Sequence, residues 1–243
     1  MCRMIFAIGG FKPKDIFIGL KEMALGNNQL HERNVDKPFP HPDGWGAYFK
    51  QGKDFKVFKS IKSCFEDEKF MSVAKKVKSN YLFLHARKST KTPRFLRNTH
   101  PFISDKFALF HNGSVKEELF FDEQYETKGN TDSEELLYFL ASNFVPEKDF
   151  ESIISALKKI KNFYKLNCFF ITKDYVYVIV YYNKNPLLGD MKMFLSDKTI
   201  VVSSEIVHTI PVHSSRWSII GNKSVLRVPL NFPEDKEIIL RRF

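Results

Sequence analysis

Stretches of apolar residues in the first half of the chain predict alternating strands and helices. Cys2 to Ile8 is largely apolar and has the length of a short strand. Apolar side chains recur at helical spacing from Pro13 to Met23 and again from Glu66 to Lys78, which predicts two amphipathic helices. Between these helices, the segments Ala47 to Lys50 and Asp54 to Ile61 predict a strand hairpin.

Two further strands are expected to be buried on both faces, because their residues are continuously apolar. These strands are Tyr81 to Leu84 and Phe107 to Phe110. Polar residues follow each of them, His85-Ala86-Arg87 after the first and His111-Asn112-Gly113 after the second. Strand ends are places where a rigid scaffold presents chemically active side chains, so these two triplets are candidate site residues.

The second half of the chain begins with helices and continues with strands. Thr131 followed by Glu134 is the pattern of a helix N-cap, and Phe150 to Ile160 predicts a second helix. The apolar stretches that follow predict strands at Cys168 to Thr172, Tyr175 to Tyr181, Met193 to Leu195, Ile200 to Ser203, Trp217 to Ile220 and Val225 to Val228. Strands, helices and again strands indicate a layered α+β fold, and we expect residues 1–243 to form one domain.

Composition and charge agree with a globular protein. The chain has 243 residues, 43% hydrophobic and 27% charged. Its net charge of +10 comes from lysines scattered along the chain rather than gathered in one patch, so we expect no nucleic-acid partner. The three cysteines show no CxxC spacing, and no apolar run approaches the ~20 residues of a membrane helix. We therefore expect no metal site, no membrane association and a cytoplasmic location.

The order Met1-Cys2 gives the first candidate for chemistry. Removal of the initiator Met1 would leave Cys2 with a thiol and a free α-amine on one residue. Because an α-amine titrates near pH ~8 and a thiol near ~8.5, the amine can accept the thiol proton at neutral pH. The alternative is a cysteine that only starts an apolar strand and is chemically inert.

Several motifs together resemble the class II glutamine amidotransferases, which belong to the N-terminal nucleophile hydrolases. The resemblance implies a four-layer αββα sandwich and a single glutamine amidotransferase type 2 domain whose mature chain starts at Cys2. Ser203-Ser204-Glu205 and Trp217 resemble the stand-alone branch of the family, which includes γ-glutamyl hydrolases. The motifs that carry the family resemblance are Cys2, His41 to Gly46, His85-Ala86-Arg87, Asn98 to Phe102, His111-Asn112-Gly113 and Thr131 to Glu134.

The resemblance implies a role for each of five residues besides Cys2. Arg87 would bind the α-carboxylate of the substrate as a bidentate fork, and Asp132 would bind its α-ammonium group. The Asn112 side chain and the Gly113 backbone N–H would form the oxyanion hole, and Thr90 would lie near the bound glutamine. The alternatives are a surface ion pair for Arg87, a first-turn helix acid for Asp132 and an ordinary Asn-Gly turn.

These roles predict a hydrolase that cleaves the γ-glutamyl amide of glutamine, or of a small γ-glutamyl compound, through a Cys2 thioester. No cofactor is expected. The ammonia would pass to a separate synthase, or the enzyme would be a hydrolase associated with a peptidase subunit; the oligomeric state is left open. Two other hypotheses are a non-catalytic regulatory subunit of the same fold, and a Cys/His hydrolase using Cys64 or Cys168 with His85 or His111.

The loop from Lys88 to Arg97 departs from the synthase-fused members of the family. Lys88 and Lys91 stand where glucosamine-synthase-like members carry Trp and His, and Arg94 and Arg97 add two further cations. One hypothesis is that this loop favours γ-glutamyl compounds with an anionic tail, because four cations would steer such a substrate. The alternative is a solvated basic loop.

Overall fold

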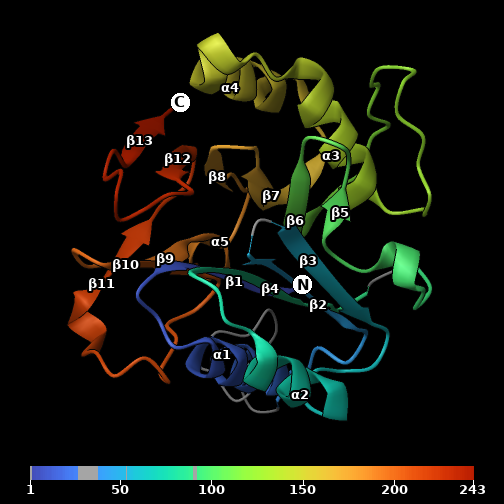
Figure 1. Ribbon diagram of the computed structural model, residues 1–243. Coiled ribbons are helices and arrows are strands. Elements are labelled where there is room, and N and C mark those ends of the chain that lie inside the picture. Colours follow the sequence, from blue (N-terminus) through green and yellow to red (C-terminus); the bar gives the residue numbers. More distant parts are fainter. Residues whose placement is uncertain (1, 27–37, 53, 90–91) are drawn as a thin grey trace.

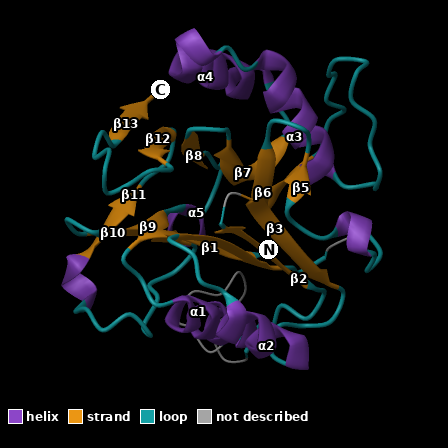
Figure 2. Cartoon of the chain, viewed as in Figure 1, coloured by secondary structure: helices purple, strands orange, loops and turns teal. Residues whose placement is uncertain are grey.

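The chain folds into four layers, in which two β-sheets are stacked between two pairs of helices. This arrangement comes from a computed structural model that describes residues 2–26, 38–52, 54–89 and 92–243. Figure 1 shows α1 and α2 on the outer side of one sheet and α3 and α4 on the outer side of the other. In Figure 2 the strands fill the two middle layers and the long helices lie outside them. The predicted αββα sandwich is confirmed.

The first sheet is centred on β1, which follows Cys2 directly. Among the described residues this sheet has seven antiparallel strands in the order β11-β9-β10-β1-β4-β2-β3. All of the β1 residues from Arg3 to Ile8 are buried, because β10 and β4 flank the strand and both of its faces are covered. The strands are β1 (Arg3–Gly9), β2 (Trp45–Gln51), β3 (Asp54–Ser60), β4 (Tyr81–Ala86), β9 (Met191–Leu195), β10 (Thr199–Ser203) and β11 (Trp217–Ile220).

The second sheet carries the other candidate motif on β6. Within the described part of the chain it has six antiparallel strands in the order β13-β12-β8-β7-β6-β5. Strand β6 continues beyond the predicted end at Phe110, so that Asn112 and Gly113 lie within the strand rather than after it. The strands are β5 (Phe102–Ile103), β6 (Ala108–Val115), β7 (Phe163–Ile171), β8 (Tyr175–Val180), β12 (Ser224–Pro229) and β13 (Ile239–Arg242).

Helices cover the outer face of each sheet. Thr131 is the N-cap of α3, as predicted, and its hydroxyl accepts a hydrogen bond from the Glu134 backbone N–H at 3.3 Å. The helices are α1 (Pro13–Leu25), α2 (Glu68–Lys76), α3 (Asp132–Asn143), α4 (Asp149–Lys159) and the single turn α5 (Pro186–Gly189). Short 3₁₀ turns lie at Leu96–Asn98, Pro146–Lys148 and Ser214–Arg216.

Three apolar layers hold the sandwich together. One lies between α1–α2 and the first sheet, one between the two sheets, and one between the second sheet and α3–α4. In the middle layer the rings of Phe6 and Phe169 meet edge to face with centroids 5.1 Å apart. Gly46 of β2 lies so close to the His100 carbonyl oxygen that an added Cβ would be 1.7 Å from it, which explains why this position is glycine.

Candidate active site

The Cys2 thiol lies at the end of β4. Because Arg3 of β1 pairs with Ala86 of β4, the residue before Arg3 comes next to the residues that follow Ala86. The Lys88 backbone N–H donates to Cys2 Sγ at 3.4 Å, and the thiol can donate to the Lys88 carbonyl oxygen at 3.7 Å. The candidate nucleophile and the polar segment after β4 are therefore brought together.

The residues around Cys2 are anchored to the end of β10. Arg3 is buried; its Nη1 donates to the Cys2 carbonyl oxygen at 3.2 Å and its Nε lies 2.5 Å from Glu205 Oε1. The Ser204 N–H donates to the Met4 carbonyl oxygen at 3.0 Å, and the Met4 N–H donates to Ser204 Oγ at 3.1 Å. These contacts fix the backbone on both sides of Arg3.

Arg87 is 4% exposed, and its guanidinium already binds several groups of its own chain. Its Nη2 donates to Thr92 Oγ1 at 2.6 Å, to the Thr92 carbonyl oxygen at 3.2 Å and to Ser89 Oγ at 3.3 Å. Nη1 makes one longer contact, 3.4 Å to the Asp43 carbonyl oxygen. Burial lowers the pKa of Arg87, while the nearby Cys2 thiolate and Asp43 carboxylate act in the opposite direction.

Asp43 connects the run at residues 41–46 with the segment that follows Arg87. The Asp43 N–H donates to the Arg87 carbonyl oxygen at 3.0 Å. Its carboxylate accepts from the Ser89 N–H at 2.7 Å and pairs with Arg94 at 2.6 Å. Asp43 therefore holds the two loops at the rim of the site in one arrangement. No role for Asp43 was predicted from the sequence.

Several cations of the basic loop after Arg87 interact with other residues of the chain. Lys88 Nζ donates to the Pro40 carbonyl oxygen at 2.9 Å and lies 3.9 Å from the centre of the Phe39 ring. Arg94 is paired with Asp43, and the Arg97 guanidinium lies 4.7 Å from the ring centre of Phe95. Lys91 and the predicted substrate-binding residue Thr90 lie outside the described residues.

Asn112 approaches the start of β1 from the second sheet. It is buried, and its Nδ2 donates to Ser204 Oγ at 3.4 Å, the same hydroxyl that accepts from the Met4 N–H. The Asn112 amide Oδ1 has no hydrogen-bond partner among the described residues. One N–H of the amide group is used by Ser204, which leaves the second N–H for another acceptor.

Gly113 lies where a side chain cannot fit. An added Cβ would be 1.7 Å from the Lys165 carbonyl oxygen of β7 and 2.6 Å from the ring of His111. Glycine is therefore required here by the close approach of two strands.

Asp132 is the first residue of α3 and lies beside the end of β6. Its Oδ2 accepts a hydrogen bond from the Val115 N–H at 2.8 Å, and its Oδ1 lies 3.4 Å from the Ser133 hydroxyl. Val115 is three residues beyond Asn112 on the same strand. The negative charge of Asp132 raises the pKa of the nearby His111, although burial of that imidazole has the larger and opposite effect.

Three buried histidines, His85, His100 and His111, lie close together. The rings of His85 and His100 are tilted by 32° with centroids 3.9 Å apart, and His85 Nε2 lies 3.2 Å from the His111 carbonyl oxygen. Burial lowers the pKa of His85 to about 3 and that of His100 well below its ordinary value, so both are neutral at pH 7.

The other two cysteines are unsuited to nucleophilic chemistry. Cys64 and Cys168 are buried, and burial raises the pKa of Cys64 to about 12 and that of Cys168 further still. Since the thiolate is the reactive form, these residues stay unreactive at neutral pH. Cys2, which is only partly buried, is the better candidate nucleophile.

Comparison with known proteins decides the family. Residues 24–167 match the family model described as glutamine amidotransferases class-II. The chain belongs to the class II glutamine amidotransferases. The matched segment contains Arg87, Asn112, Gly113 and Asp132, whereas Cys2 precedes it.

Two solved structures of this type share the class II amidotransferase fold of the chain. A glutamine aminotransferase class-II domain protein from Silicibacter pomeroyi is 18% identical, with a TM-score of 0.65 over 100% of this chain and 99% of that one. The glutamine phosphoribosylpyrophosphate amidotransferase of B. subtilis is 17% identical, with a TM-score of 0.68 over 99% of this chain and 49% of that one.

A curated sequence relative of this class II amidotransferase is an uncharacterised protein of Methanocaldococcus jannaschii. It is 26% identical over 237 residues, which cover 84% of this chain and 64% of that protein. The chain thus spans less than two thirds of this relative's length. Within the described part of the chain, no helix is both long and apolar enough to cross a membrane.

Proposed function

We propose that this class II amidotransferase hydrolyses the γ-glutamyl amide of glutamine or of a small γ-glutamyl compound, with Cys2 as the nucleophile. The observation that carries the proposal is the position of Cys2 Sγ, 3.4 Å from the Lys88 N–H and thus directly beside Arg87. A partly exposed thiol next to a cationic group is the environment in which a cysteine is activated.

The reaction proceeds in two halves. After removal of Met1, the α-amine of Cys2 takes the thiol proton, and the thiolate attacks the γ-carbonyl carbon, forming a C–S bond and placing the carbonyl electron pair on oxygen. When the C–N bond breaks, the α-ammonium group returns the proton to the leaving nitrogen. Water then attacks the thioester, releases the γ-carboxylate and restores the thiol.

The tetrahedral oxygen would be stabilised by the second N–H of the Asn112 amide and by the Gly113 backbone N–H. The hydrogen bond from Asn112 to Ser204 supports this assignment, because Ser204 in turn binds Met4, two residues from the nucleophile. The donors are held in place before the substrate arrives, so little reorganisation is needed as the negative charge develops.

Recognition of the glutamyl head group is assigned to Arg87 and Asp132. Nη2 of Arg87 is fixed by Ser89 and Thr92, which orients the guanidinium and leaves Nη1, with its longer contact, for the substrate α-carboxylate. Asp132 would bind the α-ammonium group from the start of α3, beside the end of β6. Thr90 is retained as a proposed contact of the bound glutamine.

Free glutamine is the substrate that the site supports best. Lys88 and Arg94 of the basic loop bind Pro40 and Asp43, so fewer cations are available to attract an anionic tail than the sequence suggested. The ammonia released would be used by a separate synthase; alternatively, the enzyme hydrolyses a larger γ-glutamyl compound together with a peptidase subunit.

Intact-mass measurement after treatment with the glutamine analogue 6-diazo-5-oxonorleucine tests the proposal. We expect a chain without Met1 that gains one covalent adduct, and no adduct in the Cys2→Ala variant. Cys64→Ala and Cys168→Ala are matched controls that should label normally. Absence of labelling in the wild-type protein, together with absence of glutamine hydrolysis, would instead support a non-catalytic subunit.

A further inference from the structure

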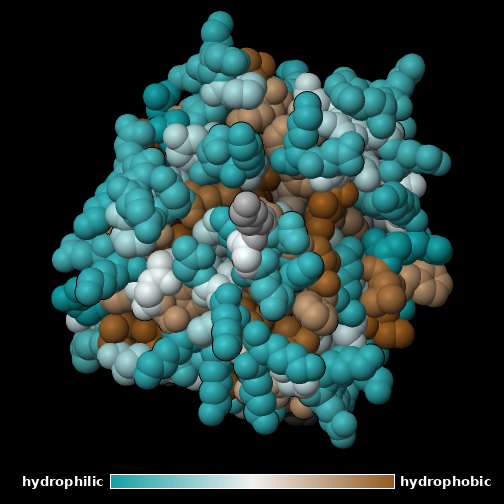
Figure 3. All heavy atoms as spheres, in the orientation of Figure 1, coloured by the Kyte–Doolittle hydropathy of each residue, from teal (hydrophilic) through white to brown (hydrophobic). Residues whose placement is uncertain are grey.

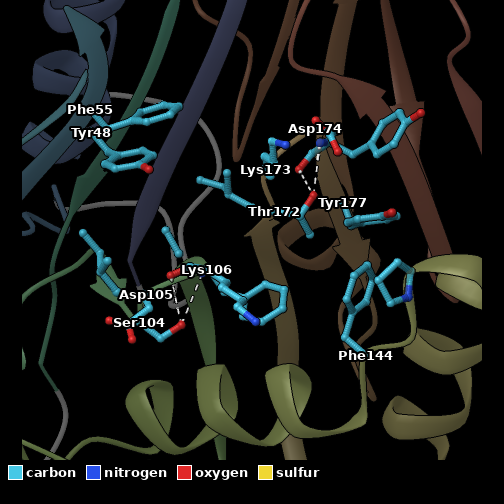
Figure 4. Close-up of a pocket in the computed structure, with 16 residues that line it drawn as sticks. Tyr48, Phe55, Ser104, Asp105, Lys106, Phe144, Thr172, Lys173, Asp174 and Tyr177 are labelled. Carbon is cyan, nitrogen blue, oxygen red and sulfur yellow. Dashed lines mark hydrogen bonds between the residues drawn. The ribbon is translucent and has the colours of Figure 1, made fainter. Parts of the chain in front are cut away.

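Strand β6 changes in chemical character along its length. Its first residue, Ala108, lines a cavity of about 640 Å³ that Tyr48 and Phe55 border on one side and Tyr177 on the other, as Figure 4 shows. On the face drawn in Figure 3, hydrophobic atoms gather right of centre, in the region that β3 and β5 occupy in Figure 1. The two lysines and two aspartates at the rim of the cavity cancel in charge. The polar end of the strand begins at His111, a buried titratable residue that the proposed mechanism does not use.

Both ring nitrogens of His111 have a polar partner, although the residue is only 1% exposed. Nδ1 lies 2.9 Å from Ser133 Oγ, and Nε2 lies 3.2 Å from the Lys165 carbonyl oxygen. Because a carbonyl oxygen can only accept, Nε2 carries a proton in this contact. Burial lowers the pKa of His111 more than the charge of Asp132 raises it, so the ring is neutral at pH 7. Nδ1 then has no proton and is an acceptor.

The Ser133 hydroxyl has one proton and two acceptors close to it. His111 Nδ1 is 2.9 Å from Ser133 Oγ, whereas Asp132 Oδ1 is 3.4 Å away. A hydroxyl donor prefers distances of about 2.5–3.0 Å, so the proton goes to His111. Asp132 Oδ2 already accepts from the Val115 N–H at 2.8 Å. Asp132 Oδ1 is thus left with no short hydrogen bond from the described residues and is available to a cation.

We propose that His111 is a positioning residue for substrate recognition. By accepting the Ser133 proton at Nδ1, it leaves Asp132 Oδ1 available for the α-ammonium group of the glutamyl substrate. This inference rests on the proposed function, in which Asp132 binds that group. If Nδ1 is removed, the Ser133 hydroxyl turns to Asp132 Oδ1 and competes with the ammonium group for it. His111 therefore affects substrate binding without touching the substrate.

Two substitutions of His111 separate the functions of the two ring nitrogens. The short amide of His111→Asn lies near the position of Nδ1 and can accept from Ser133, whereas the longer amide of His111→Gln reaches the Lys165 carbonyl oxygen and leaves Ser133 without this acceptor. We expect His111→Gln to raise KM for glutamine about three- to ten-fold with kcat nearly unchanged, and His111→Asn to keep KM within about two-fold of the wild-type value. No rise in His111→Gln, or an equal rise in both variants, would overturn the inference.

Removing the Ser133 hydroxyl tests the cause of this effect. In a Ser133→Ala background no hydroxyl can turn to Asp132, so adding His111→Gln should change KM by less than about two-fold. Ser142→Ala is the matched control, because Ser142 lies on the same helix and donates to the Tyr138 carbonyl oxygen at 2.8 Å. Combined with Ser142→Ala, His111→Gln should still raise KM. If His111→Gln raises KM as much with Ser133→Ala as without it, the effect is structural and the inference is wrong.

The tautomer of His111 can be measured without any substrate. NMR of the imidazole nitrogens at pH 7 should show a protonated Nε2 and an unprotonated Nδ1, with the signals assigned by their loss in His111→Gln. The opposite tautomer, or a doubly protonated ring, would overturn this inference and leave the proposed function standing. A wild-type protein that neither hydrolyses glutamine nor is labelled by 6-diazo-5-oxonorleucine would contradict the proposed function and, with it, this inference.

Discussion

Arg3 and Glu205 form a buried ion pair, with Arg3 Nε 2.5 Å from Glu205 Oε1 and both side chains about 5% exposed or less. The same guanidinium donates to the carbonyl oxygen of Cys2. The residue next to the candidate nucleophile is thus tied to the end of β10, across 202 positions of sequence. Glu205 acts on Cys2 through Arg3, as a positioning residue.

Replacing Glu205 tests this arrangement. Glu205→Ala leaves a buried guanidinium without this counter-charge, and we expect the free energy of unfolding to fall by about 3–5 kcal/mol. Glu205→Gln keeps an acceptor for Arg3, so the protein should remain folded, with a lower kcat for glutamine and a nearly unchanged KM. Chemical denaturation and steady-state kinetics measure the two effects.

The exposed pair Arg241–Glu151 provides the control, since its N–O distance is also 2.5 Å but its side chains are 49% and 61% exposed. Glu151→Ala should leave the melting temperature and the kinetics unchanged, because solvent screens such a pair. If Glu205→Gln also leaves kcat unchanged, Glu205 has no positioning role.

The order of the strands and long helices could be predicted from the sequence, but the extent of some strands could not. The apolar pattern predicted β6 only as far as Phe110, because Asn112 and Gly113 are not typical strand residues. Pairing with β7 continues to Val115 and extends the strand. Strands β5 and β13 were missed for another reason: β5 has two residues and β13 is an exposed edge strand, so neither carries a strong pattern.

Only part of the candidate site could be predicted from the sequence. The neighbourhood of Cys2 and Arg87 follows from the antiparallel pairing of β1 with β4, and the motifs pointed to both. Contacts between distant segments, such as Asp43 with Arg94 and Arg3 with Glu205, have no local signature. The one available signal was Arg3 itself, since a charged residue in a buried strand requires a partner.

Arg87→Lys is expected to impair substrate binding more than turnover. Lysine replaces a planar fork by a single point charge and loses the contacts to Ser89 and Thr92 that orient the group. We expect KM for glutamine to rise roughly 10- to 100-fold, because losing a hydrogen bond to a charged group costs ~1.5–3 kcal/mol of binding free energy. N-acetylglutamine and decarboxylated glutamine should be poor substrates of the wild-type enzyme. If they react as well as glutamine, the assignment of Arg87 and Asp132 to the head group fails.

Asn112→Ala is expected to lower kcat by roughly 10²–10³ with little change in KM, the usual cost of losing one oxyanion donor. Ser204 keeps its hydrogen bonds with Met4 in this variant, so the start of β1 should stay in place. Asn162→Ala, at an exposed asparagine, is the matched control and should have wild-type kcat. A loss of activity that comes with a comparable loss in melting temperature would indicate a structural role instead.

Acid should destabilise this protein through its buried histidines. Burial lowers the pKa of His85 to about 3 and lowers that of His100 strongly. Below the unfolded-state pKa of ~6.5, the unfolded chain binds protons that the folded chain does not. The contribution of these histidines to the free energy of unfolding is therefore fully present above pH ~6.5 and is lost as the pH falls towards 3. In this range each such histidine adds ~1.4 kcal/mol per pH unit to the decrease in the free energy of unfolding.

The charged and titratable groups that act on these two rings are His111 and Arg87 on both rings, and His85 and Lys59 on His100. His100→Phe removes one ionisable ring while keeping an aromatic side chain against His85 and Phe102. We expect the slope of unfolding free energy against pH to decrease by ~1.4 kcal/mol per unit between pH 6 and 5. His208→Phe, at an exposed position, should leave that slope unchanged. An unchanged slope in His100→Phe would mean that His100 is protonated in the folded protein as readily as in the unfolded chain, and a neutral ring pair with His85 would be excluded.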